Sequence, residues 1–268
     1  MRKPCIFCSG LDKKSKEHLW SQWMHDYLNL DKSSQNTREE NTYLWKDQIG
    51  NKKLERQGNL ATTKFRVVCE TCNNGWMSVL ENEVKPIFIR IFKNEGVILK
   101  REEQDLLARW IAMKAITGEH AGDDIHVTPE PDRNSLMLDK KIPESFAIYI
   151  GNHESESDTA WLRISQTIAL DPNGPNPPLG NINRNTQTIS FICGPLFVFV
   201  FVFSIREKGI IPTEFFNLGG MKQIFPPRDN IIMLDQSSAL SVKQMSNIAN
   251  ALDSMKNVKH ISELQESE

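Results

Sequence analysis

Two C-x-x-C pairs are the residues of this chain whose type and spacing best suit chemistry. Cys5 and Cys8 form the first pair, Cys69 and Cys72 form the second, and the fifth cysteine, Cys193, has no pair. Zinc prefers four soft ligands in a tetrahedron, and each C-x-x-C turn can direct two thiolates at one ion. We therefore expect one structural zinc ion held by both pairs, across a gap of 60 residues that exceeds the usual zinc-ribbon gap. The simplest interpretation of the cysteines alone is a structural zinc ion that stabilises the fold and takes part in no reaction.

An acid, a base and an amide lie next to these cysteines in the sequence. Glu17 and His18 follow the first pair, and Asn73 directly follows Cys72. Carboxylate and amide oxygens suit Mg²⁺ or Mn²⁺, and a neutral histidine can take a proton from water near neutral pH. The zinc ion would hold the helix that begins near Asn73 against the strand that carries His18. The alternatives are a structural histidine beside the zinc and a helix-capping asparagine, and Asn74 could exchange roles with Asn73.

These motifs resemble a known family of nucleases. The pattern CIFC, EH and CETCNNGWMSVLE is similar to that of the HNH, or ββα-metal, endonucleases, which are built on a treble-clef zinc scaffold. The string CNNGWMSVLE, with the later string LLARWIAMKAIT, also resembles a group of bacterial and phage proteins labelled HNH-like. The nuclease resemblance covers residues 1–84, which is less than a third of the chain.

The resemblance implies a role for each motif residue. His18 matches the histidine that activates water, Glu17 stands where the family usually has aspartate, and Asn73 matches the metal-binding asparagine or histidine. Glu17 and Asn73 would then hold a catalytic Mg²⁺ or Mn²⁺, and Asn59 is the best candidate for the middle asparagine of the motif. The structural zinc ligands implied by the resemblance are Cys5, Cys8, Cys69 and Cys72.

The implied activity is hydrolysis of phosphodiester bonds in nucleic acid, with DNA as the expected substrate. Phosphate contacts come from basic side chains near the reacting groups. The candidates for these contacts are Lys13, Lys14, Lys16 and Arg66. A rival interpretation is a zinc-stapled module that binds nucleic acid or protein and has lost its catalytic site.

Hydrophobic periodicity predicts the elements that position these residues. We expect a short helix over 19–30, a strand over 64–68, a helix over 73–84 that ends before Pro86, and a stronger helix over 102–117. Residues 118–145 look like a connection with little regular structure. Further along, the pattern changes to that of strands at 146–150, 161–168, 188–204 and 231–234, and a final helix is expected over 241–255.

The predicted fold class is α+β, with three parts. Residues 1–85 would form the zinc-bound ββα-metal module, with a polar insertion loop over about 31–60 that holds at most one short element. Residues 86–122 would be a helical connection. Residues 123–268 would form an α+β domain of unknown role, which could bind a partner protein or a second copy of the chain.

Composition narrows the class of protein. The chain has 268 residues, a formal net charge of −2, 39% hydrophobic and 25% charged residues, which excludes wholesale disorder. The near-zero charge argues against coating nucleic acid by bulk electrostatics, but the charge is uneven: residues 1–85 hold 14 basic and 11 acidic side chains. No secretory signal is visible, so we expect a cytoplasmic protein. The apolar run 189–205 has the Phe/Val composition of a buried strand, which we favour over a membrane span.

Overall fold

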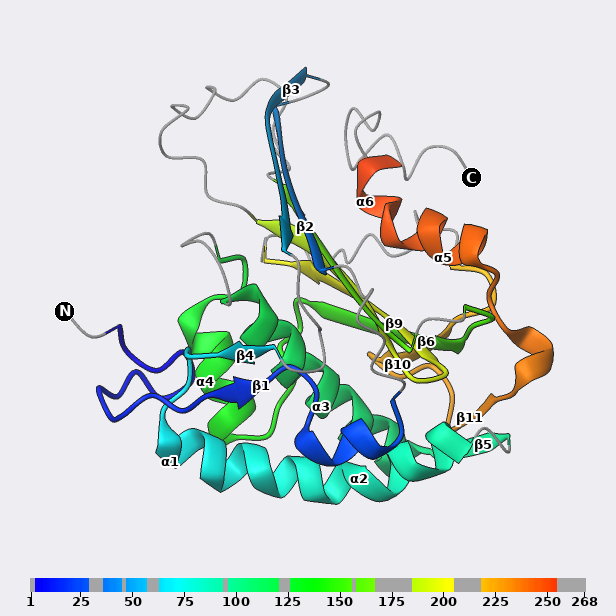
Figure 1. The fold of residues 1–268 in the computed structure, drawn as a ribbon, viewed down its shortest axis with the longest axis horizontal. Coiled ribbons are helices and arrows are strands. Elements are labelled where there is room, and N and C mark those ends of the chain that lie inside the picture. The colour runs from blue at the N-terminus through cyan, green and yellow to red at the C-terminus, as the bar shows by residue number, and fades with distance from the viewer. Residues whose placement is uncertain are drawn as a thin grey trace.

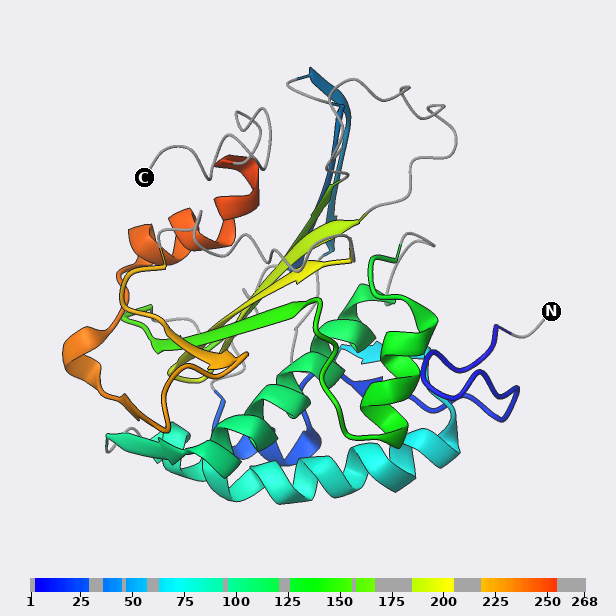
Figure 2. The ribbon, with the colours of Figure 1, turned by 180° about the vertical axis from the view of Figure 1, so that it is seen from behind.

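The structure is a computed structural model that describes residues 3–28, 36–44, 47–56, 63–93, 96–120, 126–155, 158–166, 185–204 and 218–254. It has the predicted α+β class, with a large sheet between two layers of helices (Figures 1 and 2). Helices α2, α3 and α4 lie on one side of this sheet, and α5 and α6 lie on the other.

The large sheet has seven strands among the described residues, and all neighbouring pairs are antiparallel except β2 and β7. Its strands, in spatial order, are β10 (Lys222–Phe225), β6 (Phe146–Asn152), β9 (Leu196–Phe203), β8 (Thr186–Cys193), β7 (Thr159–Gln166), β2 (Asn36–Leu44) and β3 (Asp47–Arg56). The strands predicted near 146–150 and 161–168 are therefore confirmed. The apolar run 189–205 is also β-structure, but it folds into the hairpin of β8 and β9 because the chain turns at Gly194–Pro195.

Strand β9 shows why this sheet is buried on both faces. Its sequence alternates valine with phenylalanine, and successive side chains of a strand point to opposite faces. Val198 and Val200 belong to the larger core, which extends from Cys5 to Leu234. The phenylalanines belong to a second core on the face that α5 (Val242–Ala249) and α6 (Ala251–Ser254) cover.

Helix α3 (Arg101–Glu119) is the central helix of the larger core. It packs against α2 on one side and against β6 and β10 on another, and a helix enclosed in this way is apolar on most of its surface. Its middle residues, from Leu107 to Thr117, are almost all buried. This confirms the helix predicted over 102–117.

The helix that begins at the second cysteine pair is longer than predicted. It comprises α1 (Glu70–Cys72), a π-helical turn (Asn73–Met77) and α2 (Ser78–Lys93). The expectation that it ends before Pro86 was wrong. A proline removes one backbone hydrogen bond, but the apolar side chains of Ile87, Phe88 and Ile91 are buried beyond it and carry the helix on to Lys93.

Two segments that were expected to have little regular structure contain strands or a helix. The insertion over 31–60 forms the hairpin of β2 and β3, which extends the large sheet, although its composition is polar. The connection over 118–145 contains α4 (Glu130–Leu138). The predicted helix over 19–30 is instead a short 3₁₀ helix, Gln22–Asp26. A second 3₁₀ turn, Gln236–Ser238, comes shortly before α5. Helices α5 and α6 lie within the range 241–255, where the final helix was expected.

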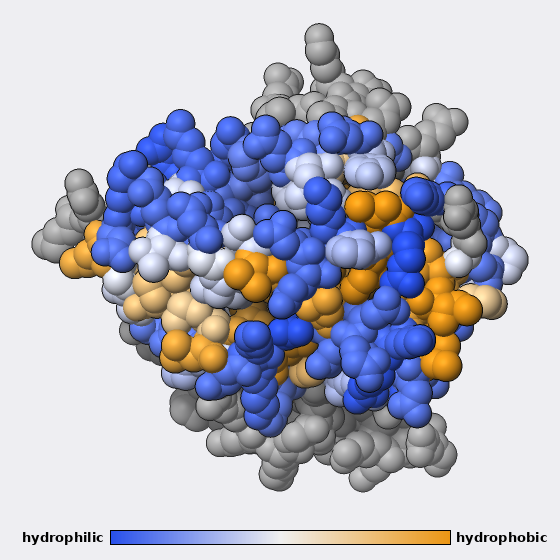
Figure 3. Space-filling model, turned by 90° about the horizontal axis from the view of Figure 1, so that it is seen from below, coloured by the Kyte–Doolittle hydropathy of each residue, from blue (hydrophilic) through white to orange (hydrophobic). Residues whose placement is uncertain are grey.

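Two small antiparallel ribbons flank the helices. β1 (Glu17–His18) pairs with β4 (Lys64–Phe65), and β5 (Val97–Lys100) pairs with β11 (Ile231–Leu234). The outer face of the second ribbon exposes Ile98, Ile231 and Met233. Figure 3 shows this side of the molecule, where apolar side chains lie in several patches among polar ones. Of the helices that the structure describes, none combines the length and the apolar character needed to cross a bilayer.

The close packing of α3 on β7 generates a test of the fold. A β-carbon at Gly118 would lie 2.8 Å from Cη2 of the buried Trp161 ring. Gly118→Ala should therefore lower the free energy of unfolding by about 1–3 kcal/mol, the usual cost of overpacking, although alanine otherwise favours a helix. Arg101→Ala, at an exposed site of the same helix, should change it by less than about 0.5 kcal/mol. Urea denaturation measures both, and equal stability of the two variants would contradict the close contact.

Candidate functional site

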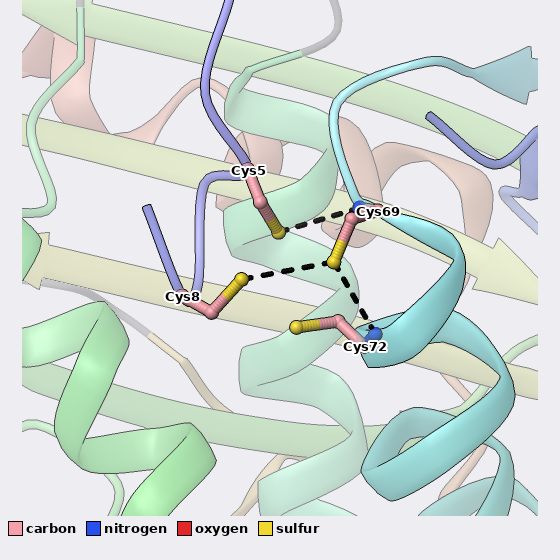
Figure 4. Close-up of side chains that lie close together, drawn as sticks. All are labelled: Cys5, Cys8, Cys69 and Cys72. Atoms are coloured by element: carbon pink, nitrogen blue, oxygen red, sulfur yellow. Dashed lines mark hydrogen bonds between the residues drawn. The ribbon is translucent and has the colours of Figure 1, made fainter. Parts of the chain in front are cut away.

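The four paired cysteines meet in space, as predicted. Their sulfur atoms all lie within 4.8 Å of one another, and Cys8 Sγ is 3.6 Å from Cys69 Sγ (Figure 4). A tetrahedral zinc ion with bonds of about 2.3 Å places its sulfur ligands about 3.8 Å apart. The cluster therefore suits a structural zinc ion, and no disulfide joins these thiols. Within the described part of the chain, it is the only group of three or more His, Cys, Asp or Glu side chains that could share an ion.

Backbone amides donate to two sulfur atoms of this cluster and support the thiolate form of Cys5, whereas burial raises the pKa of Cys8 and Cys72. The amide of Cys69 donates to Cys5 Sγ (3.3 Å), and the amide of Cys72 donates to Cys69 Sγ (3.4 Å). Burial alone would raise the pKa of Cys5, but the amide hydrogen bonds outweigh it and lower this pKa to about 7. Cys69 is also the N-cap of α1, so the metal ligands fix the start of the long helix.

Two lysines between the cysteine pairs, Lys13 and Lys14, help to hold the two cysteine-bearing segments together. Lys14 reaches back to the carbonyl oxygens of Pro4 (2.6 Å) and Val67 (2.9 Å), and it is bridged to Cys69 through the backbone. Lys13 pairs with Glu70 at 2.7 Å. The ammonium of Lys14, a predicted phosphate contact, is therefore already occupied by two carbonyls. Lys16 and Arg66 remain exposed.

Glu17, His18 and Asn73 lie around one pocket of about 590 Å³, although 54 residues separate the histidine from the asparagine. The pocket is mostly polar, with Trp23 as its one large apolar residue. Its lining includes Glu17, His18, Ser21, Asn73, Ser78 and Glu81. The three side chains selected from the sequence are thus brought together, whereas Asn59 lies outside the described residues.

His18 is half-buried at the edge of the pocket. Desolvation lowers its pKa, and the positive charge of Lys64 lowers it further, while the carboxylate of Glu81 opposes the shift. The imidazole is therefore neutral at neutral pH. His25 lies seven residues after His18, and the sequence alone predicts a surface histidine there. It is half-buried instead, and its ring meets that of His18 edge to face at a centroid distance of 6.2 Å.

Asn73 presents an amide oxygen to the pocket. Its Nδ2 donates to Ser15 Oγ at 2.7 Å, which leaves Oδ1 free to accept or to bind a cation. The residue begins the π-helical turn Asn73–Met77, and single π-turns within helices occur often at functional sites. Beyond this turn, Met77 is buried and Trp76 packs on Phe7, as expected of core residues.

A lysine from α3, which the motifs did not predict, completes the site. Lys114 is fully buried, and its Nζ lies 2.6 Å from Oε1 of Glu17 and 2.8 Å from Oε1 of Glu81. It also donates to the carbonyl oxygen of His18 (3.0 Å). Burial would lower the pKa of Lys114, but the two carboxylates outweigh it and raise this pKa. Conversely, the charge of Lys114 and a hydrogen bond from Ser21 outweigh burial and lower the pKa of Glu81.

The spacing of Glu81 in the sequence, two or more helical turns beyond Asn73, predicts a solvent-facing residue, but Glu81 lines the pocket. It lies eight residues after Asn73, which in a regular α-helix would turn it away from that residue. Between them, Gly75 has non-helical backbone angles (φ −91°, ψ −113°), and the helix is kinked there. The regular helical period is therefore interrupted between the two residues, and both line the pocket. A charged residue within the apolar run of α3 was the signal that would have indicated Lys114.

The unpaired cysteine lies in the apolar run 189–205, which predicts a buried and inert thiol. Cys193 is fully buried in β8, and burial raises its pKa well above the ordinary value. Its thiol is close to the sulfur of Met24, and such a buried, protonated thiol is inert.

In comparisons with known proteins, the chain matches no family model, no curated protein and no solved structure at a significant level. No known protein therefore adds a residue or a role to the site, which is defined by its own geometry.

The cysteine cluster predicts about one zinc ion per chain, measurable by elemental analysis of purified protein. Cys72→Ser should lower the zinc content below about half an equivalent and lower the melting temperature, because zinc binding is coupled to folding. Cys193→Ala is the matched control, since this thiol is also buried but lies outside the cluster, and it should retain the metal. Zinc-free wild-type protein, or equal loss in the two variants, would contradict the assignment.

Proposed function

We propose that this protein is a metal-dependent, HNH-type endonuclease that hydrolyses phosphodiester bonds of nucleic acid, with DNA as the expected substrate. The observation that carries the proposal is that Glu17, His18 and Asn73 line one pocket next to the cysteine cluster. Two short strands, β1 and β4, and a helix that starts at Cys69 are arranged in the order of the ββα-metal motif. This order supports the resemblance to a treble-clef zinc scaffold.

The donor set of the pocket fits a hard divalent cation. Glu17 and Asn73 would hold Mg²⁺ or Mn²⁺ through carboxylate and amide oxygens, which these ions prefer. When bound, the cation would offset charge on the scissile phosphate and stabilise the leaving 3′-oxygen.

His18 supplies the base in this proposal. Its neutral imidazole accepts a proton from a water molecule, whose oxygen forms a bond to phosphorus while the bond from phosphorus to the 3′-oxygen breaks. The lowered pKa keeps His18 unprotonated at neutral pH. The ammonium of Lys114 donates a hydrogen bond to the carbonyl oxygen of His18. This hydrogen bond fixes the backbone of His18, and the position of its imidazole depends on that backbone.

The β1–β4 ribbon offers a basic surface beside the proposed base. His18 is directly opposite Lys64 in the register, so their side chains share one face of the ribbon. Lys16 and Arg66 directly adjoin the paired residues Glu17 and Phe65 at this end of the ribbon. All three basic residues are exposed. Lys64 therefore joins Lys16 and Arg66 as a candidate for phosphate contacts, in place of the occupied Lys14.

A nicking assay with supercoiled plasmid tests the base. In the presence of Mg²⁺ or Mn²⁺, His18→Ala should slow nicking by about 100-fold or more, the usual contribution of general base catalysis. His25→Ala removes a neighbouring imidazole that does not line the pocket and should retain most of the activity. If His18→Ala cuts as fast as the wild type, His18 is not the base, and if the wild type cuts equally well without a divalent metal, the metal-dependent mechanism is contradicted. If the wild type shows no nicking with any divalent metal, the protein is better described as a zinc-stapled binding module.

Salt dependence tests the basic surface. On the non-cleaving His18→Ala background, Lys64→Ala should weaken binding of a labelled duplex and reduce the slope of log K against log salt by about 0.9 per lost phosphate contact. Lys243→Ala is the matched control, because Lys243 is equally exposed but lies on α5, across the large sheet. Fluorescence anisotropy at several salt concentrations measures both, and equal slopes would exclude the ribbon as the phosphate surface.

A further inference from the structure

Lys114 is a charged residue inside the buried, largely apolar second half of α3. Its side chain is fully buried, between Met113 and Ala115 on a helix that is enclosed on most sides. Its ammonium lies 5.7 Å from the centre of the Trp110 ring and bonds to three acceptors from elsewhere in the chain. A lysine is almost never buried in this way without partners that require its charge.

The two carboxylates share this ammonium through one oxygen each. Oε1 of Glu17 and Oε1 of Glu81 accept from Lys114, and Oε1 of Glu81 also accepts from Ser21. The second oxygen, Oε2, has no such bond in either residue, and neither Oε2 is among the buried polar atoms that lack a partner. Both residues line the pocket, so a cation bound there could use these second oxygens as ligands.

The charges of this cluster do not cancel. One ammonium and two carboxylates leave a net charge of −1 in a largely buried place, and burying an excess charge is unfavourable. One glutamate would suffice to neutralise Lys114 if the cluster served stability alone. A divalent cation on the pocket side would compensate the excess and would add the positive charge that a phosphate requires.

We propose that Lys114 is a positioning residue of the pocket: it holds Glu17 and Glu81 with their free oxygens directed at one point, so that Glu81 joins Glu17 and Asn73 as a ligand of the divalent cation. The inference rests on the proposed function, because that function supplies the cation. It extends the site beyond the motif, since Lys114 lies in the helix to which the sequence assigned no chemistry. The cation site therefore requires α3 as well as the N-terminal segment.

Binding of Mn²⁺ to zinc-loaded protein tests the role of Glu81, with free Mn²⁺ measured by electron paramagnetic resonance. Glu81→Gln should raise the dissociation constant at least about tenfold, as loss of a ligand or its support usually does. Glu83→Gln makes the same change of charge at an exposed site of the same helix and should leave it within about twofold. Equal affinity of the two variants would overturn the assignment of Glu81.

Two variants test the role of Lys114. Lys114→Arg keeps the positive charge but changes the shape of the side chain. Weaker Mn²⁺ binding by a variant that still holds zinc would show that the position of the two glutamates matters. Wild-type affinity for Mn²⁺ would overturn the proposal. If this variant fails to hold zinc, Lys114→Met combined with Glu81→Gln decides. If only the positive charge of Lys114 mattered, the double variant should bind Mn²⁺ more tightly than Glu81→Gln alone, because a positive charge near the cation has been removed. Positioning predicts weaker binding, because Glu17 has lost its anchor, so tighter or equal binding would overturn the proposal.

The failure of this inference is distinguishable from the failure of the proposed function. If zinc-loaded wild-type protein binds no Mn²⁺, the metal-dependent activity itself is contradicted. If the wild type binds Mn²⁺ and nicks plasmid while Glu81→Gln behaves like Glu83→Gln, only the roles of Glu81 and Lys114 are overturned.

Discussion

The meeting of two cysteine pairs is the constraint on which the arrangement of the pocket depends. Cys5 and Cys8 lie in an N-terminal turn, and Cys69 and Cys72 lie at the start of the long helix, with 60 residues between the pairs. A zinc ion shared by all four thiolates fixes the distance between these segments. The ribbon that carries His18 and the helix start that carries Asn73 then face each other across the pocket. Metal binding and formation of the pocket are, in this account, one process.

The buried ammonium of Lys114 is the second constraint. It joins Glu17 of the ribbon, Glu81 of α2 and its own helix, α3. Truncating one member of a buried ion cluster typically costs about 3–5 kcal/mol, because the remaining charge loses its partner. The zinc cluster positions the backbone of the pocket from one side, and Lys114 aligns two of its carboxylates from the other. Both constraints connect residues far apart in the sequence.

The sequence predicted the parts of the site that depend on residue type and local spacing. The C-x-x-C turns, the neighbouring acid and histidine and the following asparagine identified Glu17, His18 and Asn73, which the structure brings to one pocket. Period-2 and helical patterns located β6, β7 and α3. What remained hidden depends on tertiary contacts: the kink at Gly75 that interrupts the helical period before Glu81, the packing that continues α2 through Pro86, and the pairing of the polar β2–β3 hairpin with β7. Lys114 stood within an apolar helical run, but its partners could be found only in the fold.

The central claim is that the pocket holds a divalent cation beside His18 while the cysteines hold zinc. Crystals of the zinc-loaded protein soaked in Mn²⁺, with anomalous diffraction recorded at the absorption edges of both metals, test it most directly. The account predicts a zinc peak among the four sulfur atoms and a manganese peak in the pocket, within bonding distance of Glu17 and Asn73. A manganese peak at any other place, or none in crystals that contain the zinc peak, would contradict it.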